Sequence, residues 1–285
     1  MTTLGTVLTI AALTVREASR RRVLLALTAL TVVLLGLSGW GFSRLAADAG
    51  VSTLTSGEAR LTASIPLNLV MFGFSLIAAL GTAFLAGPTL SGETESGIAL
   101  AVLARPIRRS AFLLGKWLGL VTFGSGFIVI AGLAQCLVVR GTVDYWPPQP
   151  LTALALLAAQ MTVLLTLAVL LSSAVSPMAS GVAVGLFGAT WVAGVVGGLG
   201  GSLGNDAVVR VGTLSRVLLP TDGLWRGAMH AFQDPAALVE FGGAEVEAFP
   251  FLSVAPLTGA YLAWAAVWVA MVWGVAAASF LHKDL

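Results

Sequence analysis

The chain has 285 residues, of which 58% are apolar and only 10% are charged, with a net charge of +2 and a mean hydropathy of +0.96. Because a soluble domain carries about 25% charged residues, water cannot be the main solvent of this surface. The single cysteine, Cys136, excludes a disulfide framework, and two histidines without a neighbouring cysteine disfavour a metal site. The basic residues flank apolar stretches rather than forming a stripe, which argues against nucleic acid as a partner.

Long uncharged stretches predict an all-α polytopic membrane protein with six transmembrane helices. At about 1.5 Å per residue, roughly 20 helical residues cross the hydrocarbon core of a bilayer. Ser176-Pro177 divides the uncharged residues 145–205 into two crossings, because a helix tends to end before proline. The predicted crossings are Val23 to Ser43, Ile65 to about Pro88, Trp117 to Val139, Leu151 to Val175, Met178 to about Gly200, and Leu257 to Leu281.

Six crossings place both termini on one side of the membrane. Nine Lys and Arg residues fall on that side and six on the other, where three belong to one long loop. Because cytoplasmic loops are enriched in Lys and Arg, we expect both termini in the cytoplasm. The predicted organisation is a cytoplasmic N-terminus over 1–22, helices one to five over 23–200, an extracytoplasmic helical segment over 201–256, and helix six with a cytoplasmic tail over 257–285.

The predicted crossings contain no Asp, Glu, Lys, Arg or His. Ion-coupled carriers keep such residues at membrane depth, and an intramembrane hydrolase needs a nucleophile with a His or acid partner, so both classes are disfavoured. A phosphate-binding loop is not formed at Gly115-Lys116, because Ser110 stands where the pattern requires glycine and Trp117 where it requires Ser or Thr. If ATP drives this chain, a separate subunit supplies the ATPase.

The connection after the second crossing reads SGETESGIALAVLARPIRR over residues 91–109. Its acids favour a helix N-terminus, and Pro106 ends the short apolar helix after about two turns. The apolar side chains of this helix need a cover, which is either a protein partner or the bilayer surface. From spacing alone, a membrane-edge turn anchored by arginines is an equally good interpretation.

This connection resembles the signature of the type-2 ABC exporter permeases, which is an acid pair, Gly, a short apolar helix, Arg-Pro, Arg, and Gly-Lys opening the third span. The matching residues are Gly92-Glu93, Glu95, Gly97, Leu103, Arg105-Pro106, Arg109 and Leu114-Gly115-Lys116. The chain ends are similar to the family too, with Arg16-Glu17 and Arg20-Arg21-Arg22 before the first span and Lys283-Asp284 after the last. Within the family, the layout and Leu219-Pro220-Thr221-Asp222 resemble the subgroup that includes the permease for nitrous-oxide reductase maturation.

The resemblance implies a transmembrane subunit of an ATP-driven exporter in the bacterial cytoplasmic membrane, with no catalytic residue and no cofactor of its own. A separate ABC-type ATPase subunit would bind ATP and Mg. The resemblance further implies that Thr2 to about Ser19 forms an elbow helix at the cytoplasmic interface, where Leu4, Val7, Leu8 and Ala11 recur at helical spacing. Residues 93–104 would form the coupling helix that docks on the ATPase. The implied partner-binding residues are Glu93, Glu95, Gly97, Leu100, Leu103, Arg105 and Arg109.

The extracytoplasmic segment contains an amphipathic helix that we expect Asp222 to cap. Its apolar face is formed by Leu224, Trp225, Ala228, Met229 and Phe232. The family parallel places this face on the outer leaflet or over the exit path, and a packed cap without contact to substrate is an equally good alternative. Glu240, Glu245 and Glu247 favour an acidic solvated loop over a metal site.

The fifth crossing carries two small-xxx-small pairs, Gly181 with Gly185 and Gly194 with Gly198, which allow close helix approach. They fit either an interface between two permeases or packing inside one subunit. Because an exporter needs two transmembrane halves, we expect a homodimer or a pair with a close permease relative in the lipid bilayer. An alternative function is a non-transporting membrane module that relays ATPase motion to an external protein partner through residues 201–256.

Overall fold

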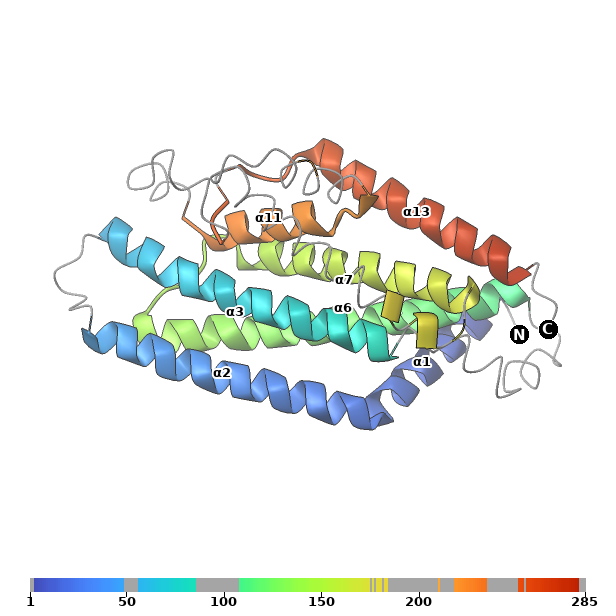
Figure 1. Cartoon of the computed structure of the whole chain (residues 1–285), viewed down its shortest axis with the longest axis horizontal. Helices are drawn as coiled ribbons and strands as arrows, with labels where there is room; N and C mark the ends of the chain where they lie inside the picture. The colour runs from blue at the N-terminus through green and yellow to red at the C-terminus, as the bar shows by residue number, and fades with distance from the viewer. Residues whose placement is uncertain are drawn as a thin grey trace.

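The computed structural model describes residues 3–48, 56–85, 108–174, 176, 178–180, 182–183, 210, 218–234, 251–253 and 255–281. The helices are α1 (Thr3–Arg20), α2 (Arg22–Asp48), α3 (Ser56–Leu85), α6 (Arg109–Val143), α7 (Pro150–Ala174), α11 (Thr221–Phe232) and α13 (Gly259–Leu281). Within these ranges no residue is in a strand. Figure 1 shows an elongated bundle in which the last turn of α13 lies beside the beginning of α6.

Among the described residues, five helices are long and apolar enough to cross a membrane, so the chain is a multi-pass membrane protein. They are Arg22–Ala47, Thr62–Phe84, Arg109–Val143, Pro150–Ala174 and Gly259–Leu281, which correspond to the first four predicted crossings and the sixth. The third was predicted too short, because α6 begins at Arg109 directly after the extended backbone of Arg108. Most of the predicted fifth crossing lies outside the described residues.

The bundle has inner and outer spans. In the most apolar window of each span, 61% of the residues of α3 and of α7 are buried, against 17% in α2 and 22% in α13. Large side chains on the outer spans are therefore open to the surroundings, with Leu25 73% and Trp40 62% exposed on α2. A bilayer or a second subunit must cover such a surface.

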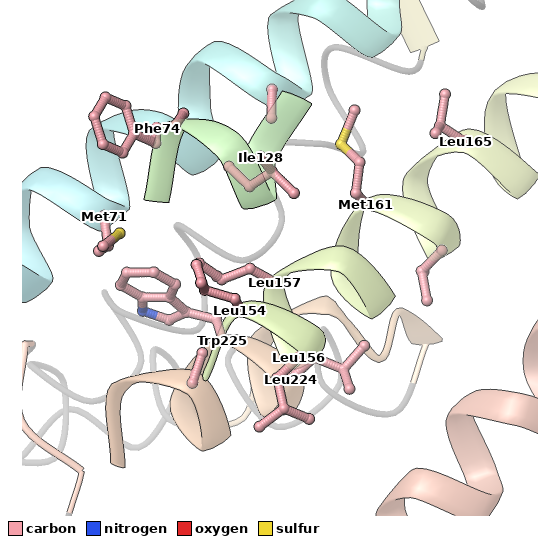
Figure 2. Close-up of a cluster of buried hydrophobic side chains, with 14 of the residues drawn as sticks. Met71, Phe74, Ile128, Leu154, Leu156, Leu157, Met161, Leu165, Leu224 and Trp225 are labelled. Atoms are coloured by element: carbon pink, nitrogen blue, oxygen red, sulfur yellow. The ribbon is translucent and has the colours of Figure 1, made fainter. Parts of the chain in front are cut away.

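The core lies where α3, α6, α7 and α11 meet. Figure 2 shows the Trp225 ring between Met71 of α3 and the side chains of Leu154 and Leu157 of α7. Trp225 and Met71 are both fully buried, and Ile128 of α6 closes the cluster. This packing holds α11 in place through many short dispersion contacts, which are individually weak but collectively strong.

Candidate functional site

The beginning of α6 is the part of the predicted partner-binding segment that the structure describes. Arg109 is the first residue of α6, and its Nη1 donates to the carbonyl of Leu281 at 3.4 Å. One turn later, the Phe112 ring stacks on Phe280 with centroids 6.1 Å apart. The end of the signature segment is thus attached to the last turn of α13. The other predicted residues, Glu93, Glu95, Gly97, Leu100, Leu103 and Arg105, lie outside the described residues.

The N-terminal helix packs on the same end of α6. The buried residues of α1 follow helical spacing and are Val7, Ile10, Thr14 and Ala18. A Cβ atom added at Gly115 would lie 2.9 Å from the carbonyl oxygen of Val7, and one added at Gly119 would lie 2.7 Å from that of Ala11. Backbone atoms of the two helices therefore approach so closely that only glycine fits at these two positions.

The predicted apolar stripe of α1 is divided between two environments. Val7 is buried against α6, whereas Leu4 and Leu8 are 70% and 58% exposed. The contact with α6 lies along Val7, Ile10 and Thr14, a protein contact that the predicted interfacial stripe did not include apart from Val7. Leu4 and Leu8 remain open to a lipid environment, which suits a helix that contacts protein on one side and a bilayer on another.

A small ion-pair cluster also joins α1 to α6. Glu17 Oε1 accepts from Arg21 Nη2 at 2.6 Å, and Glu17 Oε2 accepts from Lys116 Nζ at 3.2 Å. Burial alone would raise the pKa of Glu17, but the hydrogen bond from Arg21 and the charge of Lys116 outweigh it and hold this pKa below its usual value. Since Lys116 is only 7% exposed, the Glu17 carboxylate compensates a buried ammonium group.

At the opposite end of the bundle, α11 lies beside the first two turns of α7. Gln149, just before α7, donates its backbone N–H to the carbonyl of Ala231 at 3.2 Å. Phe72 of α3 meets the Trp225 ring edge-on with centroids 5.9 Å apart. The predicted external face is covered within the chain rather than by the outer leaflet. Its members Leu224, Trp225, Met229 and Phe232 are each at most 1% exposed.

The prediction that Asp222 caps α11 is wrong. The helix begins at Thr221, and Pro220 occupies the preceding position with φ −74°. Because the proline ring holds φ in the helical range, the chain enters the helix before it reaches the acid. Asp222 lies in the first turn instead, where Arg226 Nε donates to its Oδ2 at 3.2 Å.

Polar side chains attach the segment 251–253 to the bundle. Asn68 Nδ2 of α3 and Gln233 Nε2 both donate to the carbonyl of Phe251, at 2.9 and 3.0 Å. The backbone N–H of Ser253 donates to Gln233 Oε1 at 3.2 Å, and the His230 ring nitrogen Nδ1 lies 3.0 Å from the Ser253 carbonyl. The segment after α11 and the helix itself are thereby held to α3 as one unit.

A cavity of about 580 Å³ opens where α6 ends. Its lining consists of Arg60, Val143, Asp144, Tyr145, Trp146, Pro148 and Asp234. Arg60 Nη1 and Asp234 Oδ2 are paired at 2.7 Å, and the Tyr145 hydroxyl donates to the carbonyl of Phe232 at 2.6 Å. Burial, followed by the nearby charge of Asp234, raises the pKa of Tyr145, so the phenol remains a donor. The lining carries both signs of charge and selects neither an anion nor a cation.

A second, apolar crevice of about 30 Å³ lies between α2, α3, α6 and α7. Its lining includes Leu27, Thr82, Phe127 and Leu165. Sites for small organic molecules measure several hundred Å³, so this crevice is far too small to hold one. A path for a substrate through this region would require the spans to move or a second copy to complete it.

Sequence reasoning missed both contacts that join α1 to α6. The Gly115-xxx-Gly119 pair was visible as a small-xxx-small pattern, although Gly115 was noted only as part of the signature. Nothing local connects Glu17 with Lys116, which stand 99 residues apart. The glycines predicted for the permease interface, Gly181, Gly185, Gly194 and Gly198, lie outside the described residues.

No model of a known protein family matches the chain, and no curated protein is significantly similar to it.

Proposed function

We propose that the chain is the transmembrane permease subunit of an ATP-driven exporter of the type-2 ABC class. The resemblance of residues 92–116 to the signature of that family supports the proposal, and so do the five apolar spans. The observation that carries it is the attachment of both α1 and α13 to the first turns of α6, where the signature segment ends. A force applied at that segment would act on three helices together.

The contacts at the beginning of α6 suit the transmission of motion. An ATPase that displaces residues 93–104 would next displace Arg109, since α6 begins there. Glu17 and Lys116 would carry α1 along, and Phe112 with Phe280 would carry α13. Because α6 also packs on α7, α2 and α3, its tilt would change the arrangement of the spans. In this proposal the two permease halves alternate their access between the two sides of the membrane.

The proposed complex contains two permease copies, or one copy with a close relative, and separate ABC-type ATPase subunits that bind ATP and Mg. It lies in the bacterial cytoplasmic membrane with both termini in the cytoplasm and with coupling residues 93–109 facing the ATPase. The narrow crevice between α2, α3, α6 and α7 is consistent with a substrate path that forms between two copies or opens when the spans move. Contact between the two copies is proposed along the predicted fifth crossing, through Gly194 and Gly198.

The proposal is tested by reconstituting the full chain in proteoliposomes with candidate phosphate-loop ATPases from the same genome, beginning with any that is encoded beside its gene. We expect the wild-type chain to co-purify with the ATPase and to change its rate of ATP hydrolysis. Glu93→Arg should lower both co-purification and chain-dependent hydrolysis by at least about tenfold, since about 1.4 kcal/mol of lost binding corresponds to that factor. Glu58→Arg, the same charge reversal on α3, is the matched control and should retain both.

Two results would contradict the permease proposal. One is a wild-type chain that neither binds an ATPase nor alters ATP hydrolysis in any reconstituted mixture. The other is a Glu93→Arg variant that binds and stimulates the ATPase as the wild type does, which would remove the coupling role from this segment. The control variant separates a loss of binding in Glu93→Arg from a general effect of an added arginine.

A second function is favoured by the attachment of α11 and the segment 251–253 to α3. The hydrogen bonds from Asn68 and from Gln233 to the carbonyl of Phe251, together with the buried Trp225, would carry motion of α3 to the external surface. Such a surface suits a membrane module that acts mechanically on an external protein. Stimulation of ATP hydrolysis by the external protein alone would favour this relay, whereas stimulation by a small amphiphilic substrate would favour export.

A further inference from the structure

The break between α1 and α2 carries four arginines within seven residues, and the only acid among these residues is Glu17. Glu17 is already engaged by Arg21 and Lys116. The side chains of Arg16, Arg20 and Arg22 are exposed, and within the described part of the chain none of them forms a hydrogen bond or an ion pair. Three positive charges therefore remain available at one place on the surface.

We propose that Arg16, Arg20 and Arg22 bind the phosphate groups of anionic phospholipids at the break between α1 and α2. Arg16 and Arg20 are separated by one helical turn and so project from the same side of α1, with Cβ atoms about 5–6 Å apart. That side is turned away from α6, because the buried residues Thr14 and Ala18 are offset from the two arginines by two positions. Arg22 opens α2 directly after the break and brings a third guanidinium group to the same place.

The apolar length of α2 indicates where the headgroups lie. The uncharged stretch Val23 to Phe42 spans about 30 Å of helix, and only 17% of the most apolar window of this span is buried, so most of it is open to a bilayer. At the far end, Arg44 lies over the Trp40 ring at 5.8 Å, an arrangement typical of the membrane–water interface. Arg22, at the other end of the same stretch, is therefore level with the opposite layer of headgroups.

The exposed leucines of α1 favour a lipid over other anions. Leu4 and Leu8 are 70% and 58% exposed on the same helix as Arg16 and Arg20. A lipid would place its phosphate among the guanidinium groups and its acyl chains against these leucines. An acidic protein groove or a free phosphate would satisfy the charges but would leave the leucines in water. This inference does not depend on the proposed export function.

The test compares the full-length chain with Arg16→Gln/Arg20→Gln/Arg22→Gln by native mass spectrometry in one detergent. The probes are phosphatidylglycerol and phosphatidylcholine with identical acyl chains. Removing three charges should lower the relative affinity for phosphatidylglycerol on the order of 100-fold at low ionic strength, at roughly fivefold per charge, and leave phosphatidylcholine unchanged. The matched control is Arg44→Gln/Arg140→Gln/Arg210→Gln, which removes three exposed arginines elsewhere and should keep the preference.

A charge-retaining variant, Arg16→Lys/Arg20→Lys/Arg22→Lys, should bind phosphatidylglycerol within a few fold of wild type, which separates loss of charge from loss of fold. The proposal is overturned if the glutamine variant keeps the lipid preference, or if both lipids are lost equally. It is also overturned if water-soluble glycerophosphoglycerol competes as strongly as the lipid, because the site would then recognise a free anion. Loss of binding to a protein partner with unchanged lipid binding would equally reject it.

Discussion

Replacing Gly119 with alanine tests the backbone contact between α1 and α6. The new Cβ atom would lie 2.7 Å from the carbonyl oxygen of Ala11 and 2.7 Å from Thr14 Cβ, whereas ordinary contacts begin near 3.4 Å. Neither of these atoms can be moved by a change of rotamer at the substituted position. Helix α1 must therefore retreat by about 0.7 Å, and its contact with α6 loosens along the turn that holds Thr14.

Two opposing effects set the size of the change. Overpacking a close contact costs about 1–3 kcal/mol, while alanine in place of glycine inside a helix gains about 0.5–1 kcal/mol. The net destabilisation is about 0.5–2 kcal/mol, which at roughly 2–4 °C per kcal/mol lowers the melting temperature by a few degrees. The measurement is thermal unfolding of the full chain in a single detergent, followed by tryptophan fluorescence.

Gly126→Ala is the matched control, because it lies on the same helix and a Cβ atom there meets nothing within 4 Å. This control should leave the melting temperature unchanged or raise it slightly. If Gly119→Ala melts at or above the temperature of Gly126→Ala, the close approach of α1 to α6 is refuted.

Three further substitutions have defined outcomes. The pKa of Glu17 is lowered in the folded chain, so the stability that its ionised carboxylate contributes is complete above about pH 4.5 and is lost as pH falls through the folded pKa. The melting temperature of Glu17→Gln should therefore fall less than that of the wild type between pH 5 and pH 3, and a steeper fall would contradict the ion pair. Trp225→Ala should destabilise the chain by about 3–5 kcal/mol in detergent unfolding, because the side chain is fully buried, and Trp40→Ala, with a side chain 62% exposed, should cost much less. Tyr145→Phe should cost about 1–3 kcal/mol in the same assay, because the carbonyl of Phe232 loses a donor at 2.6 Å; an unchanged midpoint would argue against that hydrogen bond.

The crossings are predictable from sequence because a bilayer requires long uncharged helices and places charges at their ends. The predicted Val23 lies one residue inside the observed beginning of α2, Leu151 lies one residue inside that of α7, and Leu281 ends both the predicted crossing and α13. Helix α3 is one exception, since it begins at Ser56, nine residues before the predicted Ile65, and the beginning of α6 is another. There the helix continues past Lys116 to Arg109, because a charged residue beyond the apolar part of a span ends the apolar stretch without ending the helix.

The side of each crossing that faces protein is not predictable from apolar periodicity. Leu25 and Leu27 stand two positions apart on α2, yet the first is 73% exposed and the second is buried. Lipid tails and protein interiors accept the same residue types, so the contrast that marks an amphipathic helix in water is absent. Glycines mark the side that faces protein instead. Gly115 and Gly119 lie against α1, and Gly132 lies against the side chain of Leu154.

Long-range ion pairs are also outside the reach of local patterns. Glu17 and Lys116 are separated by 99 residues, and Arg60 and Asp234 by 174. The count of charged residues on each side of the membrane predicts the side on which each residue lies, but it does not predict which residues form ion pairs with each other. Pairing depends on which helix ends meet, and that follows from the packing of α1 on α6 and of α11 near the start of α3.

The proposed export and the proposed mechanical relay would both depend on the same helix. Helix α6 is continuous over 35 residues, or about 52 Å, from its attachment to α1 and α13 to the turn at Asp144. Immediately beyond that turn, the Tyr145 hydroxyl donates to the last carbonyl of α11, so under either proposal one hydrogen-bonded helix would carry a displacement of Arg109 to α11. The two functions therefore differ in what the far end contacts. For this reason the decisive comparison is between ligands offered at the end of the bundle that holds α11, while substitutions at the beginning of α6 should impair export and relay alike.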